Sequence, residues 1–199
     1  MFFLPQKPYN LLGSLRTQIT YPSTNVPTNG SYGHNDSTPR EADKEDELLL
    51  EILRRVKLDQ LATRMGAVGG ATEGSLEVDG QPDAALVGLS TCADWSKLLS
   101  LGEQQRLSFA RVLYNKPSFV ILDESTSALD LASEEAMYSL LHELNVTYVS
   151  VGHRPSLLKY HNKRLVLKGP GMAAEMTNIE ADSTSPPEVM AQLLDSDGR

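Results

Sequence analysis

The sequence predicts an α/β protein in which helices cover both faces of a parallel sheet. A continuous apolar strand is predicted at about 118–123, a second buried strand at 147–152 and a third strand at 164–168. A helix predicted at 100–114 precedes the first of these strands, and one predicted at 131–144 separates it from the second. Apolar strands that alternate with helices are typical of a parallel sheet covered on both faces.

Shorter elements are predicted in the N-terminal part. Residues 1–5 form an apolar strand that Pro5 ends, and a turn with a short helix around 12–18 follows. A longer helix is predicted at about 44–61, because its apolar residues recur at helical spacing. They form two neighbouring rows, Leu48, Ile52 and Val56 beside Leu49 and Leu53.

Three segments lack such periodicity. The segment 23–38 is rich in Ser, Thr, Asn and Gly, which predicts a disordered insertion. The Gly-rich segment 66–90 is interpreted as a loop or a second insertion. From Gly169 onward acidic residues outnumber basic ones and two prolines are adjacent, so we expect a flexible tail with at most one helix near 188–194.

Composition and charge limit the classes of function. Hydrophobic residues make up 40% of the 199-residue chain, as in a soluble domain, and the formal net charge is −8. We expect no nucleic-acid partner, because nucleic-acid-binding faces are basic. No apolar run approaches the roughly 18–20 residues that cross a bilayer, so we expect any membrane role to come through a partner.

Two adjacent carboxylates, Asp123 and Glu124, end the apolar strand predicted at 118–123. Open α/β sheets bind ligands at the carboxyl ends of their strands. In phosphoryl transfer such a pair divides the work, with Asp123 facing Mg²⁺ and Glu124 polarising the attacking water. The alternative is a strand that simply ends in solvent.

A second candidate site lies at the start of the helix predicted at 100–114. Ser100 and Glu103 have the spacing of a capping box, which predicts a helix N-terminus there. The free backbone N–H groups, the helix dipole and the Ser100 hydroxyl together would attract an anion, and Gly102 would let a phosphate approach the backbone. The alternative is a well-capped helix without a ligand.

The order of five short motifs resembles the ATPase domain of ABC transporters. The matches are the Q-loop at Phe3-Leu4-Pro5-Gln6, the signature motif at Leu99 to Glu103, the Walker B motif at Asp123-Glu124, the D-loop at Ser127-Ala128-Leu129-Asp130 and the switch histidine at Val151-Gly152-His153-Arg154. Ser100 precedes Asp123 by 23 positions and Asp123 precedes His153 by 30, as in the family. The resemblance implies a P-loop NTPase-like sheet with a helical subdomain that carries the signature motif.

Finer matches resemble subfamily D, the peroxisomal and lysosomal half-transporters with bacterial and plastid relatives. They are Pro5-Gln6-Lys7-Pro8-Tyr9, Gly13-Ser14-Leu15-Arg16, Tyr21-Pro22, Asp94-Trp95 and Gly152-His153-Arg154-Pro155-Ser156-Leu157. This resemblance covers 1–22 and 94–168, is thin over 44–62, and is absent from the insertions and the tail.

The resemblance implies a role for each matched residue. Gln6 would sense the γ-phosphate and Mg²⁺, and Asp123 would hold the metal. Glu124 would be the catalytic base and His153 would contact the γ-phosphate. The remaining matched residues would bind nucleotide or signal between the two subunits of a pair: Ser100, Gly102 and Glu103 in the signature motif, and Asp130 in the D-loop.

Three features depart from the family pattern. Leu101 stands where the family often has Gly, and Glu103 where it often has Gln. The sequence contains no G-x-x-x-x-G-K-[ST] motif, the Walker A loop that holds the β- and γ-phosphates. We therefore expect a cassette that is truncated at its N-terminus, has little ATPase activity alone, and exposes sheet edge and core.

The resemblance also implies a domain map. A partial ATPase domain would cover 1–168, with a helical subdomain at about 8–115, and an acidic flexible tail would cover 169–199. Insertions would occupy 23–43 and 66–92.

The implied cofactors are ATP and Mg²⁺, and the implied partners are a transmembrane domain and a second ATPase domain in a head-to-tail dimer. The chain would then associate with a membrane, peroxisomal, lysosomal or plastid in a eukaryote, and power transport of a hydrophobic or cofactor-like substrate.

Other interpretations stay open. The chain could be a non-catalytic partner that offers its signature motif to a complete subunit, or an isoform or incomplete gene product. A soluble ABC ATPase of DNA repair or translation fits less well. Repair enzymes carry very long coiled coils and translation factors two cassettes, whereas 94 positions separate Gln6 from Ser100 here, in a single cassette.

Overall fold

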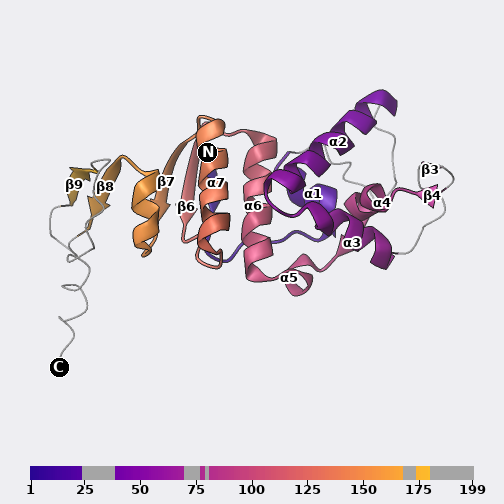
Figure 1. The fold of residues 1–199 in the computed structure, drawn as a ribbon, viewed down its shortest axis with the longest axis horizontal. Coiled ribbons are helices and arrows are strands. Elements are labelled where there is room, and N and C mark those ends of the chain that lie inside the picture. Colours follow the sequence, from indigo (N-terminus) through magenta and orange to yellow (C-terminus); the bar gives the residue numbers. More distant parts are fainter. Residues whose placement is uncertain (24–38, 70–76, 79–80, 168–173, 180–199) are drawn as a thin grey trace. The chain divides into compact units, whose positions relative to one another are not determined.

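The computed structural model of the chain describes residues 1–23, 39–69, 77–78, 81–167 and 174–179 (Figure 1). The chain forms two compact units, Met1–Val151 and Gly152–Arg199.

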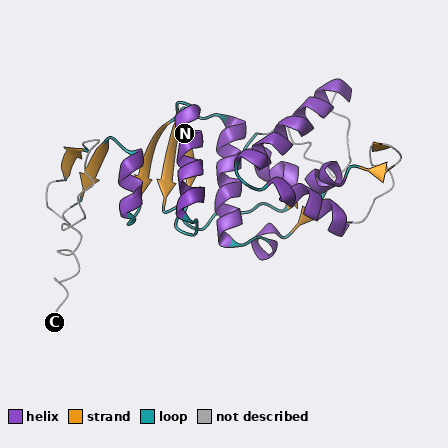
Figure 2. Ribbon diagram, viewed as in Figure 1, coloured by secondary structure: helices purple, strands orange, loops and turns teal. Residues whose placement is uncertain are grey.

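The first unit mixes short strands with helices (Figure 2). Its strands are β1 (Phe2–Leu4), β2 (Gly13–Ser14), β3 (Glu77–Val78), β4 (Gln81–Pro82), β5 (Cys92–Ala93), β6 (Phe119–Asp123) and β7 (Thr147–Val151). Its helices are α1 (Leu15–Thr20), α2 (Pro39–Arg55), α3 (Asp59–Gly69), α4 (Ala84–Ser90), α5 (Trp95–Leu98), α6 (Leu101–Asn115) and α7 (Leu131–Glu143). The second unit contains the 3₁₀ helix η1 (Pro155–Tyr160) and the strands β8 (Lys163–Val166) and β9 (Glu175–Asn178).

A three-stranded parallel sheet in the order β1-β6-β7 forms the centre of the first unit. This confirms the predicted parallel α/β arrangement and the strands predicted at 118–123 and 147–152. On one face of the sheet Leu4, Val120 and Leu122 are almost fully buried. On the opposite face Phe3 and Val149 are about half exposed, at 48% and 50%.

Helix α7 covers the buried face through a tyrosine. The hydroxyl of Tyr138 shares a hydrogen bond with the Ser150 hydroxyl at 2.9 Å, and its ring lies 5.6 Å from the ring of Tyr148 on β7. Tyr138 is 1% exposed and neighbours the fully buried Met137. Burial raises the pKa of Tyr138 to about 12, so its hydroxyl keeps its proton. The helix predicted at 131–144 is confirmed.

Helix α6 carries a buried arginine that fixes the segment after Gln6. Arg111 is 2% exposed. Its guanidinium donates to the carbonyl oxygens of Tyr9 at 2.9 Å and Gln18 at 2.7 Å, and to the Gln18 side chain at 3.2 Å. The Tyr9 ring lies 5.0 Å from the guanidinium carbon. These contacts replace the hydration that the cation loses on burial.

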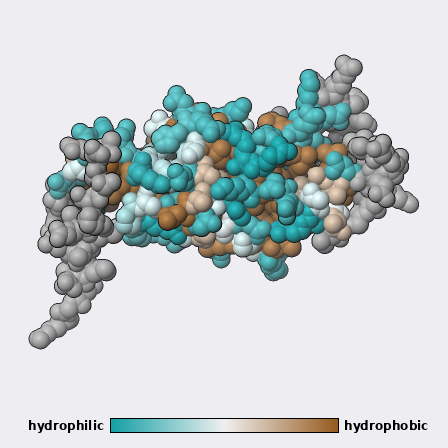
Figure 3. All heavy atoms as spheres, in the orientation of Figure 1, coloured by the Kyte–Doolittle hydropathy of each residue, from teal (hydrophilic) through white to brown (hydrophobic). Residues whose placement is uncertain are grey.

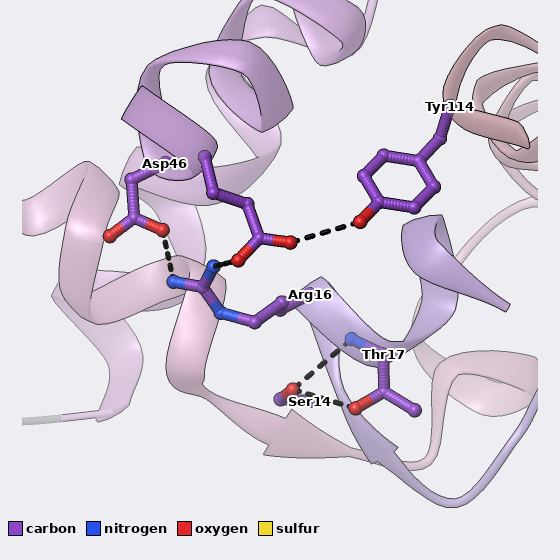
Figure 4. A network of polar contacts seen from close by, with 6 residues as sticks. Ser14, Arg16, Thr17, Asp46 and Tyr114 are labelled. Atoms are coloured by element: carbon purple, nitrogen blue, oxygen red, sulfur yellow. Dashed lines mark hydrogen bonds and ion pairs between the residues drawn. The ribbon is translucent and has the colours of Figure 1, made fainter. Parts of the chain in front are cut away.

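A polar network joins α1, α2 and α6 (Figure 4). The Arg16 guanidinium forms a salt bridge with Asp46 and lies 3.7 Å from Glu45. The Tyr114 hydroxyl donates to Glu45 at 2.9 Å. At the start of α1 the Ser14 hydroxyl accepts the Thr17 N–H, the N-cap contact shown in the same view. The network therefore holds α2 against the helix that carries Ser100 and Gly102.

The helix predicted at 44–61 is two helices, so that prediction is wrong in its second half. Lys57 adopts a left-handed conformation, with φ of 58°. The Leu58 N–H donates to the Leu53 carbonyl and the Lys57 N–H to the Arg54 carbonyl, the two bonds of a Schellman motif. Leu53 and Leu58 are both buried, so the apolar row continues across the break and conceals it in the sequence.

The loop predicted at 66–90 is also partly wrong, because α3 extends to Gly69 and α4 spans Ala84–Ser90. The two helices cross at very close range. A Cβ atom on Gly66 would lie 1.8 Å from the Ala84 carbonyl oxygen, and one on Gly88 would lie 1.7 Å from that of Ala62. The glycines are therefore the positions at which two helical backbones meet. The helix contacts extend into the range predicted as an insertion, 66–92, whereas 24–38, 70–76 and 79–80 lie outside the described residues.

The strand predicted at 164–168 does not join the central sheet. β8 pairs antiparallel with β9, with Arg164 opposite Thr177 and Leu165 opposite Met176. The tail beyond Gly169 thus contributes a strand that its acidic composition conceals. The helix considered at 188–194 lies outside the described residues.

The surface over α2 and α6 is mostly hydrophilic on the side shown in Figure 3, with apolar residues in smaller patches. No helix among the described residues has both the length and the apolar composition to cross a membrane.

Candidate functional site

Gln6 and Glu124 meet at the carboxyl ends of two neighbouring strands. β1 and β6 run parallel with Leu4 opposite Leu122, and both residues lie two positions beyond this pair. The Gln6 amide nitrogen donates to a Glu124 carboxylate oxygen at 2.5 Å. The structure therefore joins the predicted Q-loop to the predicted catalytic base.

The backbone of Glu124 is left-handed, with φ of 45°. For a residue with a Cβ atom, the left-handed backbone conformation costs roughly 1–2 kcal/mol. The Glu124 N–H donates to the Val151 carbonyl at 2.9 Å, which fixes the turn to the end of β7. The turn sends the chain away from the strand directly after Asp123.

Asp123 is the last residue of β6, next to Glu124. Magnesium ions in nucleotide sites are usually held by one or two carboxylates together with phosphates and water. Within the described residues no group of three or more His, Cys, Asp and Glu side chains is arranged to hold a metal ion. The Asp123 carboxylate and the Gln6 amide oxygen are the kinds of ligand that Mg²⁺ accepts beside phosphate oxygens.

Ser100 is the N-cap of α6, as the capping-box spacing predicts. The Glu103 N–H donates to the Ser100 hydroxyl oxygen at 3.3 Å, and the Ser100 N–H and hydroxyl both donate to the Glu103 carboxylate at 2.9 Å. The Arg64 guanidinium donates to the same carboxylate at 3.1 Å. Burial favours a raised pKa for Glu103, but the hydrogen bonds from Ser100 and Arg64 outweigh it and lower the pKa below its usual value.

Gly102 lies beside the predicted D-loop. A Cβ atom at Gly102 would lie 3.2 Å from the Ala128 carbonyl oxygen, so a larger residue would crowd that peptide. Leu101, which stands where the family often has Gly, is 43% exposed at the helix start.

Asp130 is the N-cap of α7. Its carboxylate accepts the Ser133 N–H at 2.6 Å, and this hydrogen bond lowers the pKa of Asp130 below its usual value. The local contacts thus give Asp130 a capping role, in addition to the signalling role that the family resemblance implies.

His153 lies in the second unit, two positions after the end of β7. Its grouping with Gln6, Asp123 and Glu124 stays a prediction.

Gln105 is a residue that the sequence reasoning missed. It is fully buried on α6 and bonds to both the Gln6 and the Glu124 backbone. A signal for it exists, because Gln105 shares one helix face with the apolar residues Phe109 and Val112, at helical spacing. A polar residue in an apolar row needs a buried hydrogen-bonding partner.

The chain is similar to known ABC transporter sequences. A sequence profile of the ABC transporter family matches residues 14–127, more than half of the chain. The chain is 41% identical over 175 residues to ABC transporter D family member 2, chloroplastic, of Arabidopsis thaliana, covering 83% of this chain and 22% of that protein. It is 39% identical over 172 residues to the lysosomal cobalamin transporter ABCD4 of Homo sapiens, covering 86% of this chain and 23% of that protein. An ABC transporter ATP-binding protein of Synechocystis sp. is 39% identical over 171 residues, covering 86% of this chain and 20% of that protein.

The chain thus spans about a fifth of the length of these relatives. Its fold is similar to that of a bacterial Atm1-family ABC exporter with ATP bound, with a TM-score of 0.54 and 20% identity, covering 84% of this chain and 23% of that one. The similarity to subfamily D sequences and the match to the family profile agree with the motifs in the sequence. The chain belongs to the ABC transporter family.

Proposed function

We propose that this chain is an ATP-binding and ATP-hydrolysing cassette of a subfamily D-like ABC transporter, in a form with little activity alone, and that such a cassette powers transport across a membrane. The contact between Gln6 and Glu124, at the carboxyl ends of β1 and β6, carries the proposal. It places an amide and a carboxylate side by side at the edge of a parallel sheet where such proteins bind ligands.

Each residue of this edge has a chemical role in ATP hydrolysis. Asp123 and Gln6 would hold Mg²⁺, which would supply positive charge beside the phosphates. Glu124 accepts a proton from the attacking water, and its left-handed backbone turns it away from the strand axis toward Gln6. For His153, which belongs to the second unit, the family resemblance implies a hydrogen bond to the γ-phosphate.

The start of α6 serves nucleotide bound to another subunit. Gly102 belongs to the first turn of α6, whose backbone N–H groups lie at the positive end of the helix dipole, which suits a γ-phosphate. The Ser100 hydroxyl, which donates to Glu103 in this structure, would donate to the phosphate instead. Arg64 offsets the charge of Glu103, and Asp130 belongs to the D-loop between the two halves. Two cassettes would then pair head to tail and enclose ATP between them.

The partners and the membrane follow from the same proposal. A transmembrane domain, on this or another polypeptide, would use the closure of the pair to move a hydrophobic or cofactor-like substrate. Relatives described as chloroplastic and as a lysosomal cobalamin transporter support a substrate of this class and an organelle membrane.

A second candidate function is that of a non-catalytic partner. The start of α6 is accessible, with Leu101 43% exposed, and it could complete the ATP site of another cassette without using Glu124. The two candidates share the start of α6 and differ in whether Glu124 serves ATP bound to this chain.

The experiment mixes the chain with the ATP-binding domain of the Arabidopsis relative, called here the reference cassette, and measures association by sedimentation velocity. We expect ATP with Mg²⁺ to produce a mixed dimer, and Ser100→Arg to abolish it by filling the phosphate position. The matched control Ser96→Arg changes an exposed residue of α5 and should leave association intact. The proposal is contradicted if the mixed dimer forms equally well without ATP, or if the Ser100→Arg chain still forms it.

A further inference from the structure

The side chain of Gln105 is a buried amide in the second turn of α6. It is 0% exposed, and it belongs to none of the five motifs. A buried amide must place two N–H donors and one carbonyl acceptor within the protein. Its partners therefore show what this side chain holds in place.

The partners of Gln105 come from three segments that are distant in the sequence. Its amide nitrogen lies 3.0 Å from the Gln6 carbonyl oxygen, 3.2 Å from the Ser127 hydroxyl and 3.4 Å from the Glu124 carbonyl oxygen. Its amide oxygen accepts the Ala128 N–H at 3.0 Å. One side chain thus bonds to the backbones of both Gln6 and Glu124, whose own side chains face each other.

The same helix also approaches Ala128 closely at Gly102. Gly102 lies one turn before Gln105, and a Cβ atom there would be 3.2 Å from the Ala128 carbonyl oxygen. The N–H of Ala128 donates to the Gln105 amide oxygen. This hydrogen bond fixes the distance between α6 and the segment at Ser127 and Ala128.

We infer that Gln105 is a positioning residue that aligns the hydrolytic pair, Gln6 and Glu124, and the D-loop with the signature end of α6. The inference rests on the proposed function. A shift of α6 when Ser100 meets a phosphate would pass through one side chain to Gln6, Glu124 and Ala128 together. A hydrogen-bonded amide suits this task, because its bonds specify both direction and distance, unlike apolar packing.

The neighbouring Gln104 is a matched control. It is also buried, at 7% exposure, and also bonded through its amide, but its partners are Asn10 and the carbonyls of Ser96 and Leu99. Replacing either glutamine by methionine keeps the length of the side chain and removes its hydrogen bonds.

The first measurement is amide hydrogen exchange by NMR on the whole chain without nucleotide. We expect Gln105→Met to speed exchange of the Ala128 amide by about tenfold or more, because its acceptor is lost. Gln104→Met should leave the Ala128 rate unchanged, and amides within α7 should stay protected in both variants. An unchanged Ala128 rate in a folded Gln105→Met chain overturns the inference.

A further measurement needs no variant, in case Gln105→Met does not fold. The side-chain amide protons of Gln105 should exchange at least about tenfold more slowly than those of the exposed Gln60 in the unmodified chain. Equal rates for the two side chains overturn the inference.

The functional measurement uses the mixture with the reference cassette. Gln105→Met should lower the maximal ATPase rate about tenfold, because the D-loop is no longer aligned. The concentration of chain that gives half of this rate should change less than about twofold, because Ser100 is unaltered. One contrary outcome is a Gln105→Met chain that folds and exchanges faster at Ala128 yet still gives the full ATPase rate. That result would show that Gln105 is only structural, and it would overturn the inference while leaving the proposed function standing. Where even the unmodified chain neither associates nor supports ATPase, the proposed function fails, and the positioning role fails with it.

Discussion

The amide nitrogen of Gln6 lies 2.5 Å from a carboxylate oxygen of Glu124, a residue 118 positions further along the chain. The parallel register of β1 and β6 brings the two residues together, since each follows the paired leucines Leu4 and Leu122 by two positions. The contact is therefore a consequence of the sheet, and it places a potential metal ligand beside a potential base.

Gln6→Glu would place two carboxylates against each other. In the folded chain at least one of them would have a raised pKa, since like charges at this distance disfavour double ionisation. The folded state would then bind more protons than the unfolded state, so stability would fall as pH rises above the unfolded value of about 4.3. We expect a loss of about 1 kcal/mol at neutral pH, limited by the exposure of the pair.

Thermal unfolding between about pH 4 and pH 8 measures this effect. Gln6→Met is the control, because it breaks the same hydrogen bond without adding a charge. A stability difference between the two variants that stays constant across this pH range would show that Gln6 and Glu124 are not in contact.

The polypeptide alone should hydrolyse ATP no faster than its Glu124→Gln variant. A Walker A loop supplies several charge-assisted hydrogen bonds worth about 1.5–3 kcal/mol each, and the sequence contains no such motif. Phosphate release from purified chain with Mg²⁺ and ATP is the measurement. A Mg²⁺-dependent rate that disappears in Glu124→Gln would contradict this expectation.

Glu124→Gly should be more stable than Glu124→Ala by about 1 kcal/mol. Both changes remove the carboxylate, but only glycine adopts the left-handed backbone of this position without strain. Urea unfolding gives the comparison. At Glu135, inside α7, the order should be reversed, with the alanine variant more stable than the glycine variant by about 1 kcal/mol, since alanine favours helix. Equal signs at both positions would refute the strained turn.

Glu103→Gln should lower stability at neutral pH by about 0.5–1 kcal/mol, the scale of a helix cap. The lowered pKa of Glu103 means that its stabilisation is fully present above about pH 4.5 and is lost as pH falls through its folded pKa. The difference between the two chains should therefore vanish in acid. Glu51→Gln, which breaks an exposed pair with Arg54 on α2, is the control and should have a smaller effect. A Glu103→Gln difference that persists in acid would show that the carboxylate charge is irrelevant.

Local signals predicted much of the architecture. The apolar segment before Asp123 predicted β6, and the spacing of Ser100 and Glu103 predicted the capping box that begins α6. Both depend on neighbours in sequence. The sequence also indicated that Gln6 and Glu124 act in one site, because the motif resemblance assigns both residues to the γ-phosphate region of one ATP site.

The errors come from contacts that sequence spacing does not encode. The left-handed Lys57 divides one apolar row into two helices without glycine or proline to mark the break. Gly66 begins a Gly-rich segment that has the composition of a loop. Its lack of a side chain in fact lets α3 approach α4. β8 has a partner within the acidic tail, and the role of Gln105 depends on three distant backbone segments.

The central claim is that Ser100 serves nucleotide on a partner, whereas Glu124 serves nucleotide on its own subunit. It is tested most directly by the ATPase rate of the reference cassette, in excess ATP, as this chain is added. The chain has no Walker A motif, so its contribution in this mixture comes from the start of α6 and from the D-loop. We expect the unmodified chain and Glu124→Gln to raise the rate equally, and Ser100→Ala to reduce that increase about tenfold or more. An increase that Glu124→Gln abolishes and Ser100→Ala leaves intact would contradict the account.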